Sequence, residues 1–388
     1  MSVDAARPQG SSATRVIVGL SGGVDSAVTA LLLKEQGFDV QGLFMSNWDD
    51  DDAYCTAAQD FQDARAVARE LDIPLHRVSF ASEYRERVFE HFLQEQAAGR
   101  TPNPDVLCNR EIKFGVALDY VRRLGGTRFA TGHYARVLHT AEGVELHKAR
   151  DSNKDQSYFL HAVDISQLAL TLMPLGELLK SEVRELARRA GLPVFDKPDS
   201  TGICFIGERP FREFLARFLG PQPGPIESAE GEIIGTHQGL AFYTLGQREG
   251  LQIGGRRGRL EQPWYVVAKD GMRNTLVVAQ GHDHPLLTSG ALMTERIHWL
   301  VEPRTAPFRC LVKVRYRQKD QSALCEPLPD GTARIVFDEA QRAVTPGQYA
   351  VIYEGDRCLG GGVIATTWPR VAGQAAAWHP RSDIMAGG

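Results

Sequence analysis

At 388 residues, the chain is longer than one domain of roughly 100 to 200 residues, so we expect two or three folding units and exclude a disulfide-stapled mini-protein. With 43% apolar and 24% charged residues and no apolar run near the roughly 18 residues of a membrane span, the composition predicts a soluble, cytoplasmic protein with no membrane role. The net charge of −4 excludes nucleic-acid binding through bulk charge, so an RNA partner would need local basic patches.

The first 210 residues have the pattern of an α/β domain. Residues 1–14 lack the apolar stretch of a secretory signal, and we expect them to form a disordered lead. Short apolar runs then alternate with segments of helical spacing. The predicted strands are 15–20, 39–45, 75–80 and 128–134, and the predicted helices are 24–36, 56–71, 83–96 and 113–124. This alternation predicts a doubly wound parallel sheet over residues 15–210.

After Pro210 the pattern becomes β-rich. A short helical segment, 211–219, leads into the breaker-rich sequence PQPGP. The alternating segments that follow are 235–245, 263–270, 274–281, 308–318, 333–339 and 348–355. We predict a small β-rich central linking domain over 211–284, a C-terminal β-barrel over 285–370 and a tail over 371–388.

The sequence SGGVDS, residues 21–26, stands between the first predicted strand and the first predicted helix. Its glycines let the backbone approach a ligand closely, the helix N-terminus presents unpaired N–H groups, and its serines add hydroxyl donors. The segment therefore predicts a phosphate-binding loop, although it follows neither the Walker A nor the GxGxxG pattern. The alternative is an ordinary glycine-rich turn with a serine cap.

The six cysteines are too widely spaced for redox pairs or metal-binding groups and too few for a disulfide framework. Cys108 follows two prolines and precedes an amphipathic helical pattern. There a helix dipole and the neighbouring Arg110 favour the thiolate. Cys204 lies in an apolar stretch after a Thr-Gly pair. Judged from the residues alone, each of these two is more typical of a small buried side chain. We expect Cys55, Cys310, Cys325 and Cys358 to be structural.

Long strings in the sequence carry a family resemblance. The loop SGGVDS matches the signature of PP-loop ATP pyrophosphatases, which have an adenine nucleotide alpha hydrolase-like fold and split ATP into AMP and pyrophosphate while they adenylate a carbonyl oxygen. From about residue 15 to about residue 365, the chain resembles bacterial tRNA-specific 2-thiouridylases. The matching strings are GLFMSNW, AGRTPNPDVLCNREIKF, ATGHYAR, DSNKDQSYFL, DSTGICFIGERPFREF, HQGLAFYTLGQREGLQIGG, PWYV, VRYRQ and LGGG.

The resemblance implies a site for ATP with Mg²⁺, but no metal held by protein ligands alone. The residues it assigns to the phosphates are Gly19, Leu20, Ser21, Gly22, Gly23, Val24, Asp25 and Ser26. Asp25 would help to place Mg²⁺, and Met45 and Gly132 would flank the adenosine. The rule that ligands bind at the carboxyl ends of parallel strands independently favours this placement, because all three segments follow predicted strands.

The resemblance also implies a reaction. ATP would adenylate O2 of the wobble uridine in the tRNAs for Lys, Glu and Gln, and sulfur would then replace the activated oxygen. Cys204 would carry a persulfide received from a cysteine desulfurase or a sulfur-relay protein. Cys108 would be the nucleophile that resolves it, by releasing sulfide or by assisting direct persulfide attack, and a Cys108–Cys204 disulfide would remain. Asp105 would act on the base as general acid or base, unless it only caps the following helix.

For tRNA, the resemblance implies contacts with the target base and the anticodon arm by a monomeric enzyme. The residues it assigns are Asn103, Pro104, Asp105, His133, Lys154, Asp155, Gln156, Arg315, Tyr316 and Gln348. We place Arg315, Tyr316, Arg317 and Lys319 on a predicted alternating strand. A glycine-flanked loop adds four candidate phosphate contacts, Arg248, Arg256, Arg257 and Arg259.

Three other functions are weighed against this one. A PP-loop amidotransferase would need an ammonia source, and no segment resembles a glutaminase. A cluster-dependent thiolase would need grouped cysteines. A non-catalytic RNA-binding protein would bind RNA without ATP turnover or a need for the two thiols. The acidic run at residues 49–52 is either an exposed loop or a Mg²⁺ contact.

Overall fold

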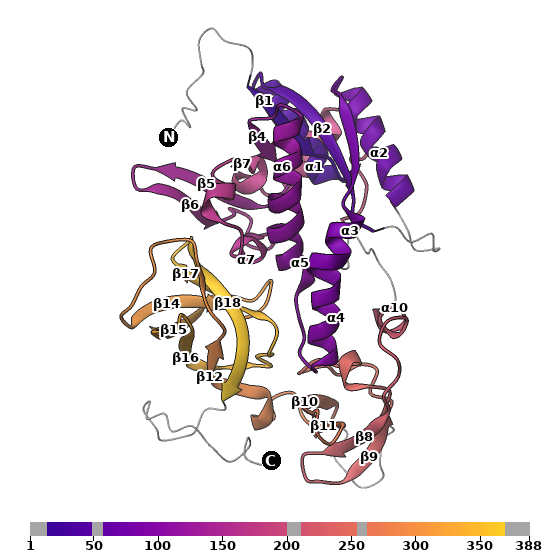
Figure 1. Cartoon of the computed structure of the whole chain (residues 1–388), viewed down its shortest axis with the longest axis vertical. Helices are drawn as coiled ribbons and strands as arrows, with labels where there is room; N and C mark the ends of the chain where they lie inside the picture. Colours follow the sequence, from indigo (N-terminus) through magenta and orange to yellow (C-terminus); the bar gives the residue numbers. More distant parts are fainter. Residues whose placement is uncertain (1–13, 49–56, 200–210, 254–261, 369–388) are drawn as a thin grey trace.

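The structure, a computed structural model of the chain, describes residues 14–48, 57–199, 211–253 and 262–368. Within them, a parallel-sheet unit lies beside a C-terminal β-barrel, and a small β-rich unit lies at the far end of a long helical segment (Figure 1). Several residues singled out above fall outside the described residues, namely Cys55, Cys204, the acidic run 49–52, and Arg256, Arg257 and Arg259. No helix of the described part of the chain is long and apolar enough to cross a membrane.

The predicted parallel sheet is present, with β1 at its centre. The strands, in spatial order, are β3 (Leu75–Ser79), β2 (Asp39–Ser46), β1 (Arg15–Gly19), β4 (Arg128–Ala130) and β7 (Thr171–Leu172). β1 pairs in parallel with both β2 and β4. Its side chains alternate between two cores, because Val16 and Val18 enter one apolar cluster and Ile17 enters another. Both faces of β1 are therefore covered, as a doubly wound sheet requires.

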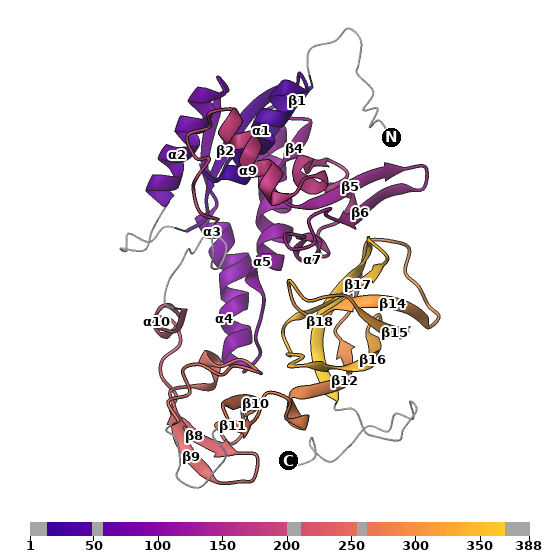
Figure 2. The ribbon, with the colours of Figure 1, turned by 180° about the vertical axis from the view of Figure 1, so that it is seen from behind.

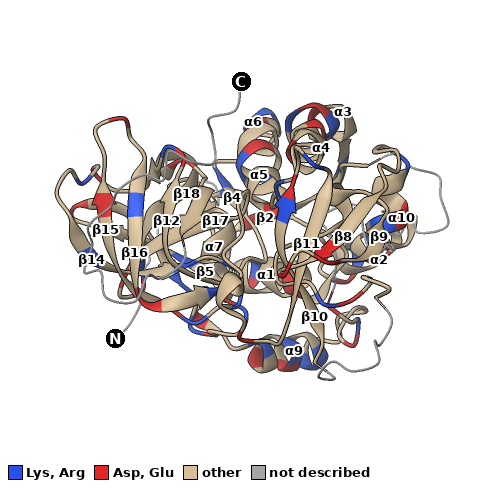
Figure 3. Ribbon diagram, turned by 90° about the horizontal axis from the view of Figure 1, so that it is seen from below, with Lys and Arg blue, Asp and Glu red and all other residues tan. Residues whose placement is uncertain are grey.

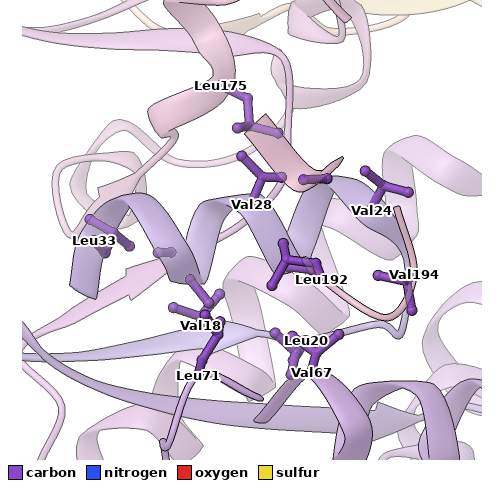
Figure 4. Close-up of a cluster of buried hydrophobic side chains, with 14 of the residues drawn as sticks. Val18, Leu20, Val24, Val28, Leu33, Val67, Leu71, Leu175, Leu192 and Val194 are labelled. Atoms are coloured by element: carbon purple, nitrogen blue, oxygen red, sulfur yellow. The ribbon is translucent and has the colours of Figure 1, made fainter. Parts of the chain in front are cut away.

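Helices cover the two faces of this sheet. On one face lie α1 (Val24–Glu35), α2 (Ala57–Glu70) and α9 (Lys180–Arg189), and on the other lie η2 (Cys108–Val116) and α6 (Ala117–Arg123). Figure 4 shows the first core, in which Val18 and Leu20 from the β1 segment meet Val28 of α1 and Val67 of α2. The helical periodicity of the sequence produced this packing, since each helix turns an apolar face to the sheet.

The predicted helix over 83–96 is one longer helical run. It consists of α3 (Ala81–Tyr84), η1 (Arg85–Phe89) and α4 (Glu90–Ala97), with π-type hydrogen bonding over η1. In Figures 1 and 2 this run extends from the parallel sheet toward the central unit, and α4 contacts η4 there. The remaining elements of the first part are α5 (Pro104–Leu107), β5 (Ala135–Thr140), β6 (Gly143–Lys148), α7 (Ser157–Leu160), α8 (Ile165–Leu168) and η3 (Pro174–Glu177).

The central unit is a mixed four-stranded sheet. Its strands lie in the order β10 (Trp264–Asp270), β11 (Thr275–Gln280), β8 (Gly224–Ser228) and β9 (Ile233–His237). The helical elements around it are α10 (Phe211–Ala216) and η4 (Leu240–Phe242). The strand predicted over 235–245 ends at His237, because Gly239 has φ +150° and a short helical turn follows.

The C-terminal strands form the predicted barrel. In order around it are β12 (Thr288–Thr294), β16 (Ala333–Arg342), β15 (Gln321–Pro327), β14 (Phe308–Lys313), β17 (Tyr349–Glu354) and β18 (Arg357–Trp368), and β18 pairs with β12 to close the ring. β13 (His298–Trp299) pairs with β18, and η5 (Pro285–Leu287) precedes β12. Closure pairs both strands that would otherwise be edges of the sheet.

One strand prediction in the barrel was wrong. The alternating segment 308–318 continues as a strand only to Lys313, and Arg317 has φ +62°. A residue with a left-handed backbone cannot belong to an extended strand, and this conformation is also strained for residues other than glycine. Arg315, Tyr316, Arg317 and Lys319 therefore lie on the loop between β14 and β15.

The barrel packs directly against the parallel-sheet unit. The Tyr158 hydroxyl donates to the carbonyl of Tyr349 at 3.1 Å, and Lys313 pairs with Asp155 at 3.0 Å. The Gln348 side chain donates to the carbonyl of Thr101 at 2.7 Å. Thr101 lies just before the segment that carries Asn103, Asp105 and Cys108, so the barrel anchors the start of that segment.

Candidate active site

The loop that follows β1 has the local geometry of an anion cradle. Gly22 has φ +79°, and a Cβ at this position would lie 2.3 Å from the carbonyl oxygen of Asp60 on α2. Gly23 is the N-cap of α1 and supplies no side-chain cap for the first N–H groups of the helix. A 12-residue helix thus presents its N-terminus beside a loop whose backbone can approach a ligand closely.

The two serines of SGGVDS close the loop on itself. The hydroxyl of Ser26 accepts from the backbone N–H of Ser21 at 3.2 Å and donates to the carbonyl of Gly23 at 3.1 Å. The Ser21 and Ser26 hydroxyl oxygens are 3.2 Å apart. These bonds hold the loop in its curved shape, and the side chain of Ser21 is exposed.

Gly132 and Met45 come together with this loop, as the placement at strand ends predicted. A Cβ on Gly132 would lie 2.9 Å from the backbone nitrogen of Ser26, so only glycine permits this approach of β4's end to the loop. The methyl carbon of Met45 lies 3.5 Å from where a Cβ on Gly19 would stand. The residues present fit a nucleotide, because Gly19 ends β1 and Gly132 lies just after β4, so that backbone without side chains borders the N-terminus of α1 at the carboxyl ends of these strands.

An ionic cluster that the sequence analysis did not single out lies beside the loop. We use the name ionic cluster for Asp25, Lys154, Lys180, Arg184 and Asp199. Lys180 pairs with both carboxylates, Asp25 and Asp199, at 2.7 Å in each case. Asp199 also pairs with Lys154 at 2.6 Å and with Arg184 at 2.8 Å. Figure 3 shows both basic and acidic residues along α9, and no motif distinguishes Lys180 and Arg184 from the other charged residues of this helix.

The cations of the cluster determine the charge state of Asp199. Burial acts to raise the pKa of Asp199, but hydrogen bonds from Lys154 and Lys180 outweigh it and lower the pKa to about 2. Burial and the nearby Asp25 carboxylate raise the pKa of Tyr134, so its hydroxyl stays protonated and donates to Asp25 at 2.9 Å. Asp199 is therefore ionised and the Tyr134 hydroxyl is neutral at neutral pH.

Cys108 lies in a different environment, within packed apolar side chains. It is the first residue of η2, has 0% exposure, and shares an apolar cluster with Trp48 and Phe89. The helical run begins at Pro104, so the thiol lies one turn inside it. Arg110, expected to act on this thiol, pairs with Glu111 at 2.8 Å.

The helix cap before Cys108 is Asn103, not Asp105. The side chain of Asn103 accepts from the backbone N–H of Asp105 at 3.2 Å, and Asp105 lies in the first turn of α5. The alternative in which Asp105 caps the helix was therefore wrong. Its carboxylate is partly exposed on the segment that ends at Cys108.

Several polar atoms near the carboxyl end of β2 are buried and have no hydrogen-bond partner among the residues that the structure describes. Both amide atoms of Asn47 are of this kind, and the residue is 1% exposed. So are the indole nitrogen of Trp48 and the side-chain oxygen of Asn109, whose amide nitrogen donates to the Asp105 carbonyl at 3.0 Å. Such groups cost free energy, and a ligand with a donor and an acceptor would satisfy them. All three residues lie within the strings GLFMSNW and AGRTPNPDVLCNREIKF that carry the family resemblance, but no sequence pattern predicts that their polar atoms are buried.

Three family models match consecutive parts of the chain. They are described as tRNA methyl transferase HUP domain (residues 14–208), tRNA methyl transferase PRC-barrel domain (212–280) and Aminomethyltransferase beta-barrel domain (289–364). The chain is 56% identical over 368 residues to the tRNA-specific 2-thiouridylase MnmA of Marinobacter nauticus, with 93% of each chain covered. It is 58% identical over 356 residues to the protein of the same name from Pseudomonas paraeruginosa, with 91% of this chain and 94% of that one covered. The chain belongs to the tRNA-specific 2-thiouridylase family.

The residues that the 2-thiouridylase resemblance assigns to the anticodon arm have partners within the protein. Lys154 is held by Asp199. Asp155 is 4% exposed, pairs with Lys313 and accepts from the backbone N–H groups of Ala149 and Ser157. Gln156 accepts from the backbone N–H of Tyr134 at 3.0 Å. In this structure Asp155 and Gln156 hold the backbone of the segment in place, and Lys154 forms an ion pair with Asp199.

The other tRNA assignments of the 2-thiouridylase resemblance are similarly engaged. Arg315 donates to the carbonyl of Ala343 at 2.6 Å, and the ring of Tyr316 lies 4.5 Å from that of Phe159. His133 is 7% exposed and lies 2.8 Å from the hydroxyl of Thr131. Burial, together with the charge of Lys113, lowers the pKa of His133 well below its usual value. Its imidazole is therefore neutral at physiological pH.

No group of three or more His, Cys, Asp and Glu side chains suited to a metal ion lies within residues 14–48, 57–199, 211–253 and 262–368.

Proposed function

We propose that the chain catalyses ATP-dependent 2-thiolation of the wobble uridine in the tRNAs for Lys, Glu and Gln. The observation that carries this proposal is the identity of 55–58% to 2-thiouridylases over 91–95% of the chain. The phosphate loop at the carboxyl edge of the sheet and Cys108 on the adjoining helical segment support it.

The first step is activation of the base. Residues 19–26 hold the phosphates of ATP, and Met45 and Gly132 border its adenosine. Asp25 would help to hold the Mg²⁺ that accompanies the phosphates, and the ion would neutralise part of their charge. O2 of the uridine attacks the α-phosphorus, the bond to the β-phosphate breaks, and pyrophosphate leaves. Preorganised N–H donors at the start of α1 and the ammonium group of Lys180 stabilise the charge that develops.

The second step replaces the activated oxygen with sulfur. Cys204 carries a persulfide received from a cysteine desulfurase or a sulfur-relay protein. In one route, Cys108 attacks the inner sulfur of the persulfide and releases sulfide, which adds at C2. In the other, the terminal sulfur adds to C2 directly and Cys108 then attacks Cys204. In both routes the C2–O bond breaks with loss of AMP, a Cys108–Cys204 disulfide forms, and an external thiol supplies two electrons to reopen it.

We propose that Asp105 moves a proton in these steps. Asn103 fixes the backbone of Asp105 through the helix cap, and the barrel fixes Thr101 just before it. The Asp105 carboxylate is only half-buried, so a base brought to this segment can reach it. The burial of Cys108 keeps its thiol from solvent oxidants until a substrate base is present.

The test is nucleoside mass spectrometry of unmodified tRNA incubated with the protein, ATP, Mg²⁺, cysteine and a cysteine desulfurase. We expect 2-thiouridine with the unaltered chain and none with Cys108→Ser or Cys204→Ser. Cys358→Ser is the matched control, because Cys358 is also buried but lies in the barrel. Thiolation that survives in Cys108→Ser or Cys204→Ser would remove that cysteine from the mechanism. ATP cleavage to AMP without a thionucleoside would leave adenylation standing but contradict the proposed sulfur transfer.

A further inference from the structure

The carboxylate of Asp199 is surrounded by cationic side chains in the way that a protein surrounds a bound anion. Three cationic side chains converge on its carboxylate, with Lys154 at 2.6 Å, Lys180 at 2.7 Å and Arg184 at 2.8 Å. Charge-assisted bonds of this length are among the stronger hydrogen bonds in proteins, and basic groups arranged in this way also recognise phosphate. The receptor is thus already built, and one of the protein's own carboxylates occupies it.

This receptor is continuous with the phosphate loop. Lys180 is the first residue of the 10-residue helix α9, and its ammonium group also pairs with Asp25, in the first turn of α1. Lys197, two residues before Asp199, donates to the carbonyl of Gly22 within the loop at 3.1 Å. A polyphosphate held by the loop therefore extends toward the cations that Asp199 now occupies.

Asp199 and a phosphate cannot share these cations at low energetic cost. The cluster contains three cations and two carboxylates, and adding a phosphate would bring a further anion to a carboxylate with a depressed pKa. Like charges at hydrogen-bond range repel strongly in a partly buried site. The side chain of Asp199 is 31% exposed and lies outside any helix or strand, so it can leave the cations without disturbing the core.

We propose that Lys180 and Arg184 receive the phosphates of ATP that depart as pyrophosphate, and that Asp199 occupies their place until the nucleotide binds. The inference rests on the proposed function, which makes ATP the ligand of the loop. It predicts that removing the negative charge of Asp199 strengthens the binding of ATP, whereas removing a charged residue from a binding site usually weakens binding. If the cations are open in only about a tenth of molecules, the intrinsic affinity for ATP is masked about tenfold.

The first test is calorimetric titration of the full-length protein with Mg²⁺-ATP in the absence of tRNA. We expect Asp199→Asn to bind ATP about tenfold more tightly than the unaltered chain, and Lys180→Met to bind it at least about tenfold more weakly. Asp196→Asn is the control, because Asp196 is exposed on the same segment. Unchanged or weaker binding by Asp199→Asn would overturn the proposal. An unaltered chain that binds no ATP at all would contradict the proposed function instead.

The second test needs no variant and so does not depend on the folding of one. A carbodiimide joins a carboxylate to an amine in contact with it, and the Asp199–Lys180 pair should give such a cross-link in the nucleotide-free protein. Saturating Mg²⁺-ATP should suppress this cross-link and leave the Lys148–Asp320 cross-link, formed at 2.8 Å beside the barrel, unchanged. Peptide mass spectrometry measures both. An Asp199–Lys180 cross-link that persists at saturating ATP would overturn the proposal.

Discussion

The two halves of the candidate active site are held by opposite kinds of force. The predicted phosphate loop is bordered by the ionic cluster, whose charged side chains are held by ion pairs with one another. We propose that a bound anion can replace a carboxylate in these pairs. Cys108 is held by packing, among fully or nearly fully buried aromatic rings such as Trp48 and Phe89. The difference matches the tasks we propose, because a polyanion must enter and leave one half, while the other must hold a thiol in one position.

The largest effect on stability is expected in the packed half. Phe89 is 2% exposed, and its ring lies 4.8 Å from each of the rings of Trp48 and Phe218. Phe89→Ala removes most of this contact and should lower the free energy of unfolding by about 3–5 kcal/mol. Chemical denaturation measures it. Phe195→Ala is the control, since Phe195 is 42% exposed and should change stability by at most about 0.5 kcal/mol. Equal losses for the two variants would contradict the contrast between the halves.

Acid should weaken the interface between the sheet unit and the barrel before it weakens the ionic cluster. Burial lowers the pKa of His161 to about 4, and the His161 ring meets the ring of Tyr349 edge to face, with the ring centroids 4.9 Å apart. A histidine with a depressed pKa is protonated first in the unfolded chain, so its contribution is complete above about pH 6.5 and declines as the pH falls toward 4. The loss should approach about 3 kcal/mol. For Asp199, with its pKa lowered to about 2, the corresponding loss falls between about pH 4 and pH 2.

Urea unfolding at pH 7 and pH 4.5 tests this order. His161→Gln should flatten the decline between the two pH values, whereas His139→Gln, at an exposed position of β5, should leave it unchanged. A decline that is equally steep in His161→Gln would mean that other groups cause the acid sensitivity.

The loop itself should respond to one added methyl group. Gly22 and Gly37 have similar left-handed backbones, with φ +79° and +86°, but only Gly22 has a neighbour in the way, the Asp60 carbonyl at 2.3 Å. Gly37→Ala should cost about 1 kcal/mol of stability and leave ATP binding unchanged. Gly22→Ala should in addition weaken ATP binding by at least about tenfold, equivalent to about 1.4 kcal/mol. Calorimetry on the matched pair measures this, and equal ATP affinities would show that the loop tolerates the side chain.

The sequence predicted the parts of the site that depend on local pattern. The turn between β1 and α1, the placement of Met45 and Gly132 beside it, and the three-part architecture follow from strand–helix alternation and the rule for parallel strand ends. Phosphate binding by this turn stays a prediction. The ionic cluster could not be predicted, because Lys180 and Asp199 are ordinary charges until the fold brings them to Asp25. Arg315 was wrongly predicted to lie on a strand, because an alternating sequence pattern does not reveal a residue with a left-handed backbone conformation, such as Arg317. Burial of Asn47 without partners is likewise a property of packing alone.

The smallest expected effect concerns Gln348, which the resemblance assigns to tRNA and the structure bonds to Thr101. Gln348→Ala removes one partly buried hydrogen bond and should lower the free energy of unfolding by about 1 kcal/mol. If Gln348 acts by anchoring the segment that carries Cys108, the turnover rate falls while the affinity for tRNA stays the same, since the base arrives but the thiol is less well placed.

A direct contact with tRNA would give the opposite result. The affinity would then fall with little change in the turnover rate of the bound complex. Filter binding and single-turnover thiolation on the same variant separate the two effects. Gln318→Ala is the control, because the side chain of Gln318 bonds to Val314 and Gln341 in the C-terminal part of the chain. A fall in turnover in Gln348→Ala but not in Gln318→Ala would extend the packed half of the site from Cys108 to the barrel, which would then be part of the support for the thiol.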